Sequence, residues 1–169
     1  LTPEFCRLAG YFISEGYGSS NRALSIASYS STIREDVALC FEKVFPGIHL
    51  NITKKEVLCY SRLVSEIFST MFGTYAKNKF IPSFLLNADL ISIKHLLKGL
   101  WAGDGCISNE RAAYKTISED LANSLIFILL RFRIVPNIQY SEKYGIQLSL
   151  RGKTIKQLAE ILDAKEIVI

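Results

Sequence analysis

The sequence predicts an α+β protein built from two similar halves, each running helix, two strands, helix, two strands, helix. An internal repeat supports this prediction, because LAGYFISEG (8–16) and LKGLWAGDG (97–105) occupy equivalent places in the two halves. Strand segments with alternating apolar and polar residues lie between segments with helical spacing. We therefore expect a first half at 1–76, a linker at 77–92 and a second half at 93–169, with two pseudo-symmetric antiparallel four-stranded sheets.

The first half shows a strand pair with a clear alternation at 48–62, with KKE (54–56) at the turn. Its apolar members are Ile48, Leu50 and Ile52, and its polar members are His49, Asn51 and Thr53. The other elements expected in this half are helices at 8–16, 34–45 and 63–72 and a strand region at 22–30. Pro82 in the linker interrupts any helix there.

The second half repeats this order with helices at 97–105, 118–132 and 154–162, a strand region at 111–117 and a strand pair at 134–151. EKYG (142–145) supplies the hairpin turn. One set of alternating residues is apolar: Ile138, Tyr140, Ile146, Leu148 and Leu150. The opposite set is polar: Asn137, Gln139, Ser141, Gln147, Ser149 and Arg151. Helices are expected to cover the apolar face of each sheet, which leaves the polar face open.

Composition is that of a globular protein, with 49% apolar and 21% charged residues. No apolar run reaches the roughly 18–20 residues of a membrane span, so we expect no membrane partner. The chain begins at Leu1 without a signal pattern, and we expect an intracellular segment, in the cytoplasm or nucleoid of a prokaryote or in an organelle. The net charge of +4 permits a nucleic-acid partner without requiring one.

The four cysteines, Cys6, Cys40, Cys59 and Cys106, form no CxxC pair, and His49 and His95 are too few and too distant for a zinc site. We expect buried, reduced thiols.

Small residues recur one turn apart in the two repeated helices, as Gly10 and Ser14 in one and Gly99 and Gly103 in the other. A helical glycine costs about 1 kcal/mol relative to alanine, so this spacing suggests a close helix pair that brings the terminal acids together. Those acids, Glu15 and Asp104, are the residues of interest at the helix ends.

Each acid stands at the unfavourable end of its helix dipole, and two neighbouring carboxylates repel. A divalent cation such as Mg²⁺ would relieve both effects and would suit a phosphodiester hydrolase. For either acid alone, a solvated helix end is the simpler interpretation. The recurrence of the acid at the same place in a repeat makes that interpretation weaker.

LAGYFISEG and LKGLWAGDG resemble the two signature motifs of the LAGLIDADG homing endonucleases of the monomeric, two-motif class, of the archaeal-intron or intein type. The resemblance covers the whole chain. The first segment of the chain, LTPEFCRLAGYFISEGY (1–17), is similar to the start of intein-embedded endonuclease domains. The segment IPSFLLNADLISIKHLLKGLWAGDG (81–105) is similar to the part of those domains that leads into and includes the second motif. The absence of splicing blocks predicts that the chain is not a complete intein. An intron-encoded, free-standing enzyme is favoured over an excised intein domain, which is the alternative.

This resemblance implies a monomer whose motif helices form the interface between halves and whose sheets form a saddle over the major groove of double-stranded DNA. Glu15 and Asp104 would bind Mg²⁺, helped by the carbonyls of Ser14 and Gly103; Mn²⁺ would substitute, and Ca²⁺ would bind without cleavage. Both strands of a long site would be cut across the minor groove, leaving 3′ overhangs.

Lys115, Arg62 and Arg151 occupy strand-end positions where the family places basic helpers, so they join the two acids as candidate catalytic residues. Ser28, Ser30 and Thr32 stand where a Gln or Lys is common in the family.

The expected DNA contacts come from the polar sheet faces and their turns. They are Arg22, Ser25, Tyr29, His49, Asn51, Thr53, Tyr60, Arg62, Arg111, Lys115, Asn137, Gln139, Ser141, Gln147, Ser149, Arg151 and Lys153. An ordinary solvated sheet face is the alternative. Lys54, Lys55, Lys77 and Lys79 are expected in solvated turns, where contact with flanking phosphates is a secondary possibility.

Three functions are compatible with the sequence. A site-specific homing endonuclease is the leading hypothesis. An RNA maturase, with intron RNA as partner, and a non-cleaving DNA-binding regulator are the alternatives. The presence of both acids favours the enzyme over the regulator, and it does not separate the enzyme from the maturase.

Overall fold

The computed structural model describes residues 1–18, 23–143 and 145–164, and it confirms the α+β fold with two four-stranded antiparallel sheets. The first half contains α1 (Pro3–Glu15), β1 (Gly16–Gly18), β2 (Leu24–Ala27), α2 (Ser31–Val44), β3 (Leu50–Ile52), β4 (Glu56–Cys59) and α3 (Arg62–Phe72). The second half contains α5 (Leu90–Gly103), β5 (Gly105–Ile107), β6 (Ala112–Thr116), α6 (Glu119–Arg131), β7 (Asn137–Ser141), β8 (Gly145–Leu150) and α7 (Lys153–Leu162). Between them lie the 3₁₀ turn η1 (Ala76–Asn78) and α4 (Ser83–Leu86).

Both repeated helices begin earlier than their motifs. The hydroxyl of Thr2 accepts a hydrogen bond from the amide of Phe5 and caps α1, with Pro3 in its first turn. Asp89 caps α5 by accepting a 2.9 Å bond from the amide of Ser92, so α5 starts inside the segment expected as a linker.

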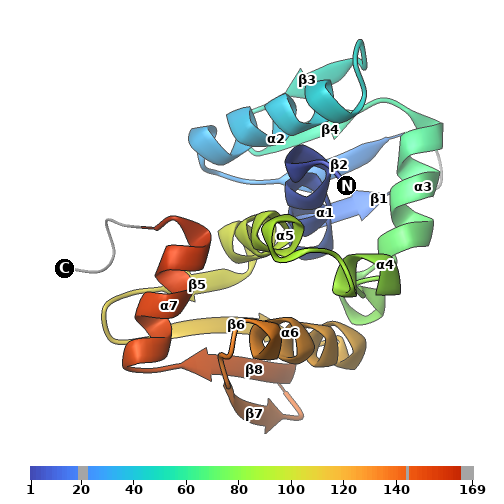
Figure 1. Cartoon of the computed structure of the whole chain (residues 1–169). Coiled ribbons are helices and arrows are strands. Elements are labelled where there is room, and N and C mark those ends of the chain that lie inside the picture. The colour runs from blue at the N-terminus through green and yellow to red at the C-terminus, as the bar shows by residue number, and fades with distance from the viewer. Residues whose placement is uncertain (19–22, 144, 165–169) are drawn as a thin grey trace.

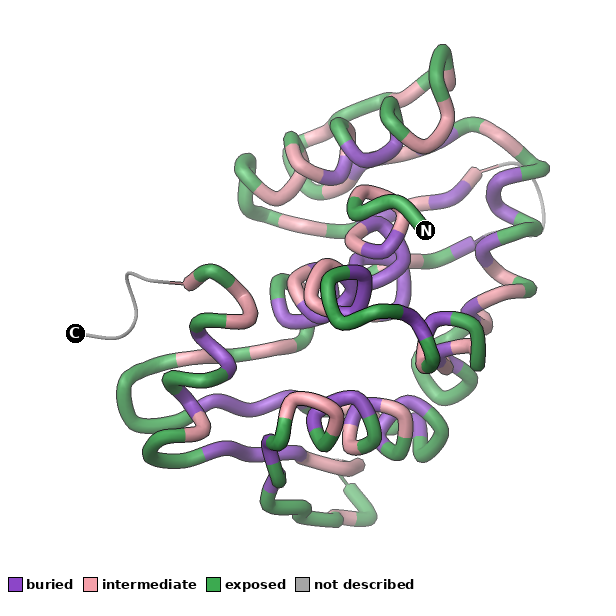
Figure 2. Tube along the Cα trace, in the orientation of Figure 1, coloured by how far each residue is buried: buried purple, intermediate pink, exposed green. Residues whose placement is uncertain are grey.

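The two sheets have the same strand order, β1-β2-β4-β3 and β5-β6-β8-β7, with every neighbouring pair antiparallel. Figure 1 shows the halves on either side of the central α1–α5 pair, with α2 and α3 on the first sheet and α6 and α7 on the second. Buried residues concentrate in this central pair and along the helix sides that face the sheets (Figure 2).

The apolar alternation of the second sheet is buried on its inner strands but not at its edge. Leu148 and Leu150 on β8 are buried. Ile138 and Tyr140 on β7 share their face but are 56% and 70% exposed. The reason is that α6 packs against β6 and β8, whereas β7 is the edge strand beyond that cover.

Among the described helices, none is long and apolar enough to cross a membrane. Cys6, Cys40 and Cys59 are buried free thiols, as expected. Cys106, on the edge strand β5, is exposed, which corrects the expectation for the fourth cysteine.

Candidate functional site

The central helix pair is in backbone contact at two glycines. A Cβ atom on Gly10 would overlap the carbonyl oxygen of Leu96 and lie 2.9 Å from the Cα of Gly99. A Cβ atom on Gly99 would overlap the carbonyl oxygen of Arg7. Because these neighbours are backbone atoms that cannot move aside cheaply, only glycine fits at either position. The α1–α5 axes therefore approach more closely than ordinary side chains permit.

The same close approach brings the two acids to one place. A Cβ atom on Gly103 would overlap the Ser14 side chain and lie 2.7 Å from the Cγ of Glu15. The Ser14 hydroxyl donates to the carbonyl oxygens of Gly10 (3.1 Å) and Tyr11 (3.2 Å), which keeps it inside its own helix. Since Asp104 directly follows Gly103, Glu15 and Asp104 end neighbouring helices side by side.

The electrostatics show the cost of this arrangement. Partial burial of the carboxylate and then the charge of Glu15 raise the pKa of Asp104 to about 6, against a smaller opposing effect of the Tyr114 hydroxyl. Partial burial also raises the pKa of Glu15. Both residues retain substantial solvent-accessible surface, so the carboxylates remain open to a ligand from outside. Two acids with raised pKa values at one accessible point indicate a site for a cation or a proton.

These donors fit a hard divalent cation. Two carboxylates are available together with the carbonyls of Ser14 and Gly103, which lie in the last turns of α1 and α5, where carbonyls lack partners within the helix. No group of three or more His, Cys, Asp or Glu side chains suited to a metal occurs among residues 1–18, 23–143 and 145–164. The donor set therefore suits Mg²⁺ or a similar ion that retains water and phosphate ligands, rather than zinc.

A cavity of about 230 Å³ opens on the Asp104 side of the pair and contains two lysines. Lys115 on β6 is exposed, and its side chain shares this cavity with Asp104 and Ser14. Lys79, the second lysine, enters from the segment between the halves. The structure thus brings Lys115, one of the three expected basic helpers, into one cavity with Asp104.

Lys79 was expected in a solvated turn, and that expectation is wrong, since the residue is only 4% exposed. Its ammonium group donates to the carbonyl oxygens of Phe12 (2.8 Å) and Gly16 (2.9 Å) and lies 3.6 Å from the Phe12 ring centroid. Burial lowers the pKa of Lys79 to about 7, while the two carbonyls favour its charged form. Lys79 therefore caps the end of α1 that carries Glu15.

The Lys79 backbone also reaches the second half, because its carbonyl oxygen accepts a 2.6 Å bond from the hydroxyl of Ser118, the N-cap of α6. The neighbouring residues Asn78 and Phe80 give no sequence signal that Lys79 caps a helix. Its burial and its hydrogen-bond partners in the structure identify this role.

A second cavity of about 250 Å³ lies on the Glu15 side, where the described lining residues include no lysine or arginine. Tyr11 and Tyr29 line it together with Glu15. The Tyr11 hydroxyl donates to Asp36 at 2.7 Å, and Asp36 also pairs with Arg7 at 2.9 Å, which ties α2 to α1 behind the cavity. The two cavities therefore differ in charge, because two lysines line the one on the Asp104 side and no lysine or arginine is among the described residues lining the one on the Glu15 side.

The open face of the second sheet carries a row of hydrogen-bonding side chains that begins at Lys115, beside Asp104. Lys115 pairs in register with Gln147, and Gln147 with Gln139, whose amides share a 3.1 Å hydrogen bond. These three residues line a cavity of about 500 Å³. The next row is less accessible, because Ser149 is 5% exposed and its hydroxyl bonds the carbonyl of Asn137 at 3.5 Å, so Ser149 does not offer the free contact expected of it.

The corresponding face of the first sheet is less basic. The row Tyr17, Ser25, Leu58 and Asn51 crosses it in register. Ser25 bonds the carboxylate of Glu56, an acid on this face that the sequence pattern did not reveal. At its far edge, His49 and Tyr60 are exposed with stacked rings 6.3 Å apart. Thr53 uses its hydroxyl to accept bonds from the amides of Lys55 and Glu56 in the turn.

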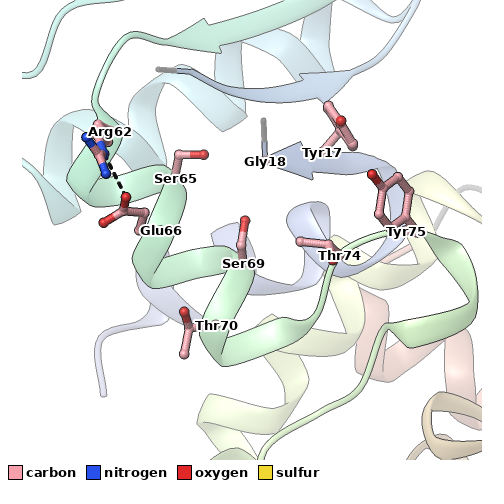
Figure 3. Close-up of a pocket in the computed structure, with 9 residues that line it drawn as sticks. All are labelled: Tyr17, Gly18, Arg62, Ser65, Glu66, Ser69, Thr70, Thr74 and Tyr75. Atoms are coloured by element: carbon pink, nitrogen blue, oxygen red, sulfur yellow. Dashed lines mark hydrogen bonds and ion pairs between the residues drawn. The ribbon is translucent and has the colours of Figure 1, made fainter. Parts of the chain in front are cut away.

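Arg62 lies in a different cavity from the acids. It opens α3 and pairs with Glu66 at 2.7 Å on one side of a cavity of about 560 Å³, with Tyr17 and Tyr75 on the other side (Figure 3). The lining of this cavity contains neither Glu15 nor Asp104. The structure therefore does not place Arg62 with the catalytic candidates.

Arg151 is also remote, because it follows the end of β8 that pairs with Ala112, whereas Asp104 precedes Gly105, which pairs with Tyr114 in the middle of β6. Arg111 and Lys153 are exposed at the same distal end, and Ser141 at the far end of β7 is half-buried. Arg22 lies outside the described residues.

Comparison with known proteins agrees with this architecture. Residues 93–162 match the family model of the LAGLIDADG-like domain. Mesophilic variants of the homing endonuclease I-DmoI share the fold with a TM-score of 0.74, over 96% of both chains at 12% identity. I-DmoI has also been seen in complex with DNA and Mn and with DNA and Ca. The predicted resemblance is confirmed for the fold and, in the second half, for the domain family.

Two relatives in sequence are longer proteins from archaeal organisms. The uncharacterized protein MJ1054 of Methanocaldococcus jannaschii is 27% identical over 98% of this chain and 21% of its own length. A DNA polymerase of a Thermococcus species (strain GE8) is 27% identical over 75% of this chain and 8% of its own. The chain thus spans about a fifth or less of these relatives.

Proposed function

We propose, for a chain with a LAGLIDADG-like domain at 93–162 and the whole-chain fold of a homing endonuclease, that it is a site-specific DNA endonuclease cutting both strands of a long duplex site. The observation that carries the proposal is the convergence of Glu15 and Asp104 at the ends of two helices in backbone contact. Two neighbouring acids whose pKa values are raised, at an accessible point of the surface, are typical of a functional site.

Glu15 and Asp104, with the carbonyls of Ser14 and Gly103, are the residues that would hold Mg²⁺ or Mn²⁺. The bound cation would supply water activation and stabilisation of the leaving oxygen. Occupancy would also offset the burial and the charge repulsion that raise the pKa of Asp104, so metal binding and fold stability are coupled at this point.

The other residues of the site bind and orient the DNA. The exposed ammonium of Lys115, beside Asp104, would pair with a phosphate oxygen near the scissile bond. Lys79 would hold the end of α1, and with it Glu15, in place through the Phe12 and Gly16 carbonyls. Gln147 and Gln139 continue outward from Lys115 and offer amide donors and acceptors to base edges.

The internal repeat places both halves of the site in one chain, so we expect a monomer on duplex DNA. Light scattering of the protein with and without DNA checks this expectation. The expected result is one chain for each duplex.

The function is tested by selecting cleaved molecules from a randomised duplex library in Mg²⁺ and sequencing their ends. The expected result is one enriched site with 3′ overhangs on both strands. The Asp104→Asn variant should bind that site and leave it intact, and Ca²⁺ should support binding without cleavage. Glu160→Gln is the matched control, because Glu160 is an exposed acid on the covering helix α7 and belongs to neither the acid pair nor the expected DNA contacts.

Tight binding of one DNA sequence by the unaltered protein without cleavage, in Mg²⁺ and in Mn²⁺, would overturn the endonuclease and indicate a DNA-binding regulator. Selective binding of structured intron RNA in place of duplex DNA would indicate the maturase. The same selection repeated with a pool of RNA molecules separates these two outcomes, because it shows which nucleic acid the protein prefers.

A further inference from the structure

The hydroxyl of Tyr114 is buried at the point where the two acids meet. Tyr114 lies on β6 with no exposed surface, and its ring packs against Trp101 with centroids 5.3 Å apart. In the described part of the chain its hydroxyl has no hydrogen bond of regular geometry, although it interacts with the Asp104 carboxylate. A buried hydroxyl without a regular partner is rare and indicates a function that the fold alone does not supply.

The internal repeat provides a comparison for this residue. Gly105 directly follows Asp104 and pairs in register with Tyr114. Gly16 directly follows Glu15 and pairs in register with Ile26. Ile26 is therefore the counterpart of Tyr114 in the other half, and it is equally buried.

Tyr114 and Ile26 lie in similar backbone surroundings, but their side chains differ in chemistry. A Cβ atom on Gly105 would overlap Trp101, and one on Gly16 would overlap Phe12, each an aromatic three residues before its acid. The backbone thus approaches an aromatic ring in the same way in both halves. What differs is a hydrogen-bond donor beside Asp104 and an alkyl group in the same place beside Glu15.

Resting on the proposed metal-dependent function, we propose that Tyr114 is a positioning residue for Asp104 and makes the two metal-binding half-sites unequal. Its hydroxyl donates to one carboxylate oxygen and leaves the other directed to the cation. Such an outer partner fixes the orientation of a ligand and contributes to metal affinity. Glu15, opposite Ile26, receives no such donor, so its orientation depends on its own longer side chain.

The test measures Ca²⁺ affinity by calorimetry with Tyr114→Phe in two backgrounds. Glu15→Gln leaves the Asp104 half-site, and Asp104→Asn leaves the Glu15 half-site. We expect Tyr114→Phe to weaken Ca²⁺ binding about three- to tenfold in the first background, as for loss of one hydrogen bond, and to change it less than twofold in the second. The stability of Tyr114→Phe in urea should change little, because loss of the interaction with Asp104 is offset by removal of a buried polar group.

Ile26→Val is the matched control and should alter stability without changing Ca²⁺ affinity in either background. Equal loss of affinity in both backgrounds, or no loss in either, would overturn the proposal. A clear loss of stability with unchanged affinity would assign Tyr114 a packing role and would also overturn it. Absence of Ca²⁺ binding by the unaltered protein, both alone and with its duplex DNA site, would reject the metal-dependent function itself, a result that is separate from these.

Discussion

The substitution Asp104→Asn tests whether the two acids are held together against their own repulsion. Partial burial and then the charge of Glu15 raise the pKa of Asp104 to about 6 from 3.8. A folded-state pKa above the unfolded value means that the folded protein binds the proton more tightly. The ionised carboxylate therefore costs stability above pH 4, and the full cost is present above pH 6.

The magnitude follows from the size of that shift. A difference of about two pKa units corresponds to about 3 kcal/mol. Because Asp104 is accessible to solvent, screening reduces the expected effect to about 1–2 kcal/mol. Without divalent metal, Asp104→Asn should thus unfold at higher urea than the unaltered protein at pH 8, by about 1–2 kcal/mol, and this advantage should shrink toward zero as the pH falls from 6 to 4.

The assay is urea unfolding in EDTA at several pH values, repeated with Ca²⁺. Ca²⁺ should stabilise the unaltered protein and stabilise Asp104→Asn much less. Glu142→Gln, at an exposed turn, is the control and should change stability by less than about 0.5 kcal/mol at every pH. A loss of stability in Asp104→Asn at pH 8, or a gain that does not depend on pH, would refute the electrostatic reasoning and assign the acid a structural role.

Three further substitutions test other parts of the structure. Gly10→Ala should destabilise the protein by about 1–3 kcal/mol, measured by urea unfolding, because it forces the central helices apart. Helix propensity alone would instead stabilise the variant by about 1 kcal/mol. Such a gain in stability would contradict the backbone contact. Burial lowers the pKa of Lys79 to about 7, so between pH 7 and pH 10 the unfolded chain binds this proton and the folded protein does not. The stability of the unaltered protein should therefore rise over that range, and the stability of Lys79→Met should not show this rise. An identical pH profile in both proteins would contradict the burial of the charge. Gln139→Ala should change base preference in the selected DNA site without altering stability, and an unchanged site would remove this row of the sheet from recognition.

Much of the fold follows from local patterns in the chain. Alternation predicted the strand pairs because side chains on a strand point to opposite faces, and helical spacing predicted the covering helices because one side must be apolar. The alternation could not predict that Ile138 and Tyr140 are exposed. Exposure on an edge strand depends on how far α6 extends over the sheet, which no local pattern records.

The sequence by itself determined the pseudo-symmetric pair of helices and the two acids at their ends, because a repeat is visible without coordinates. Only the tertiary structure decided which other groups reach those acids. Lys79 caps the end of α1 by bonding Phe12, which is 67 residues away in the sequence. Arg62 lies in a separate cavity, although its position in the sequence resembled that of a catalytic helper. Such contacts join segments distant in sequence, so they depend on packing of the whole chain, whereas periodicity and capping depend on neighbours within a few residues.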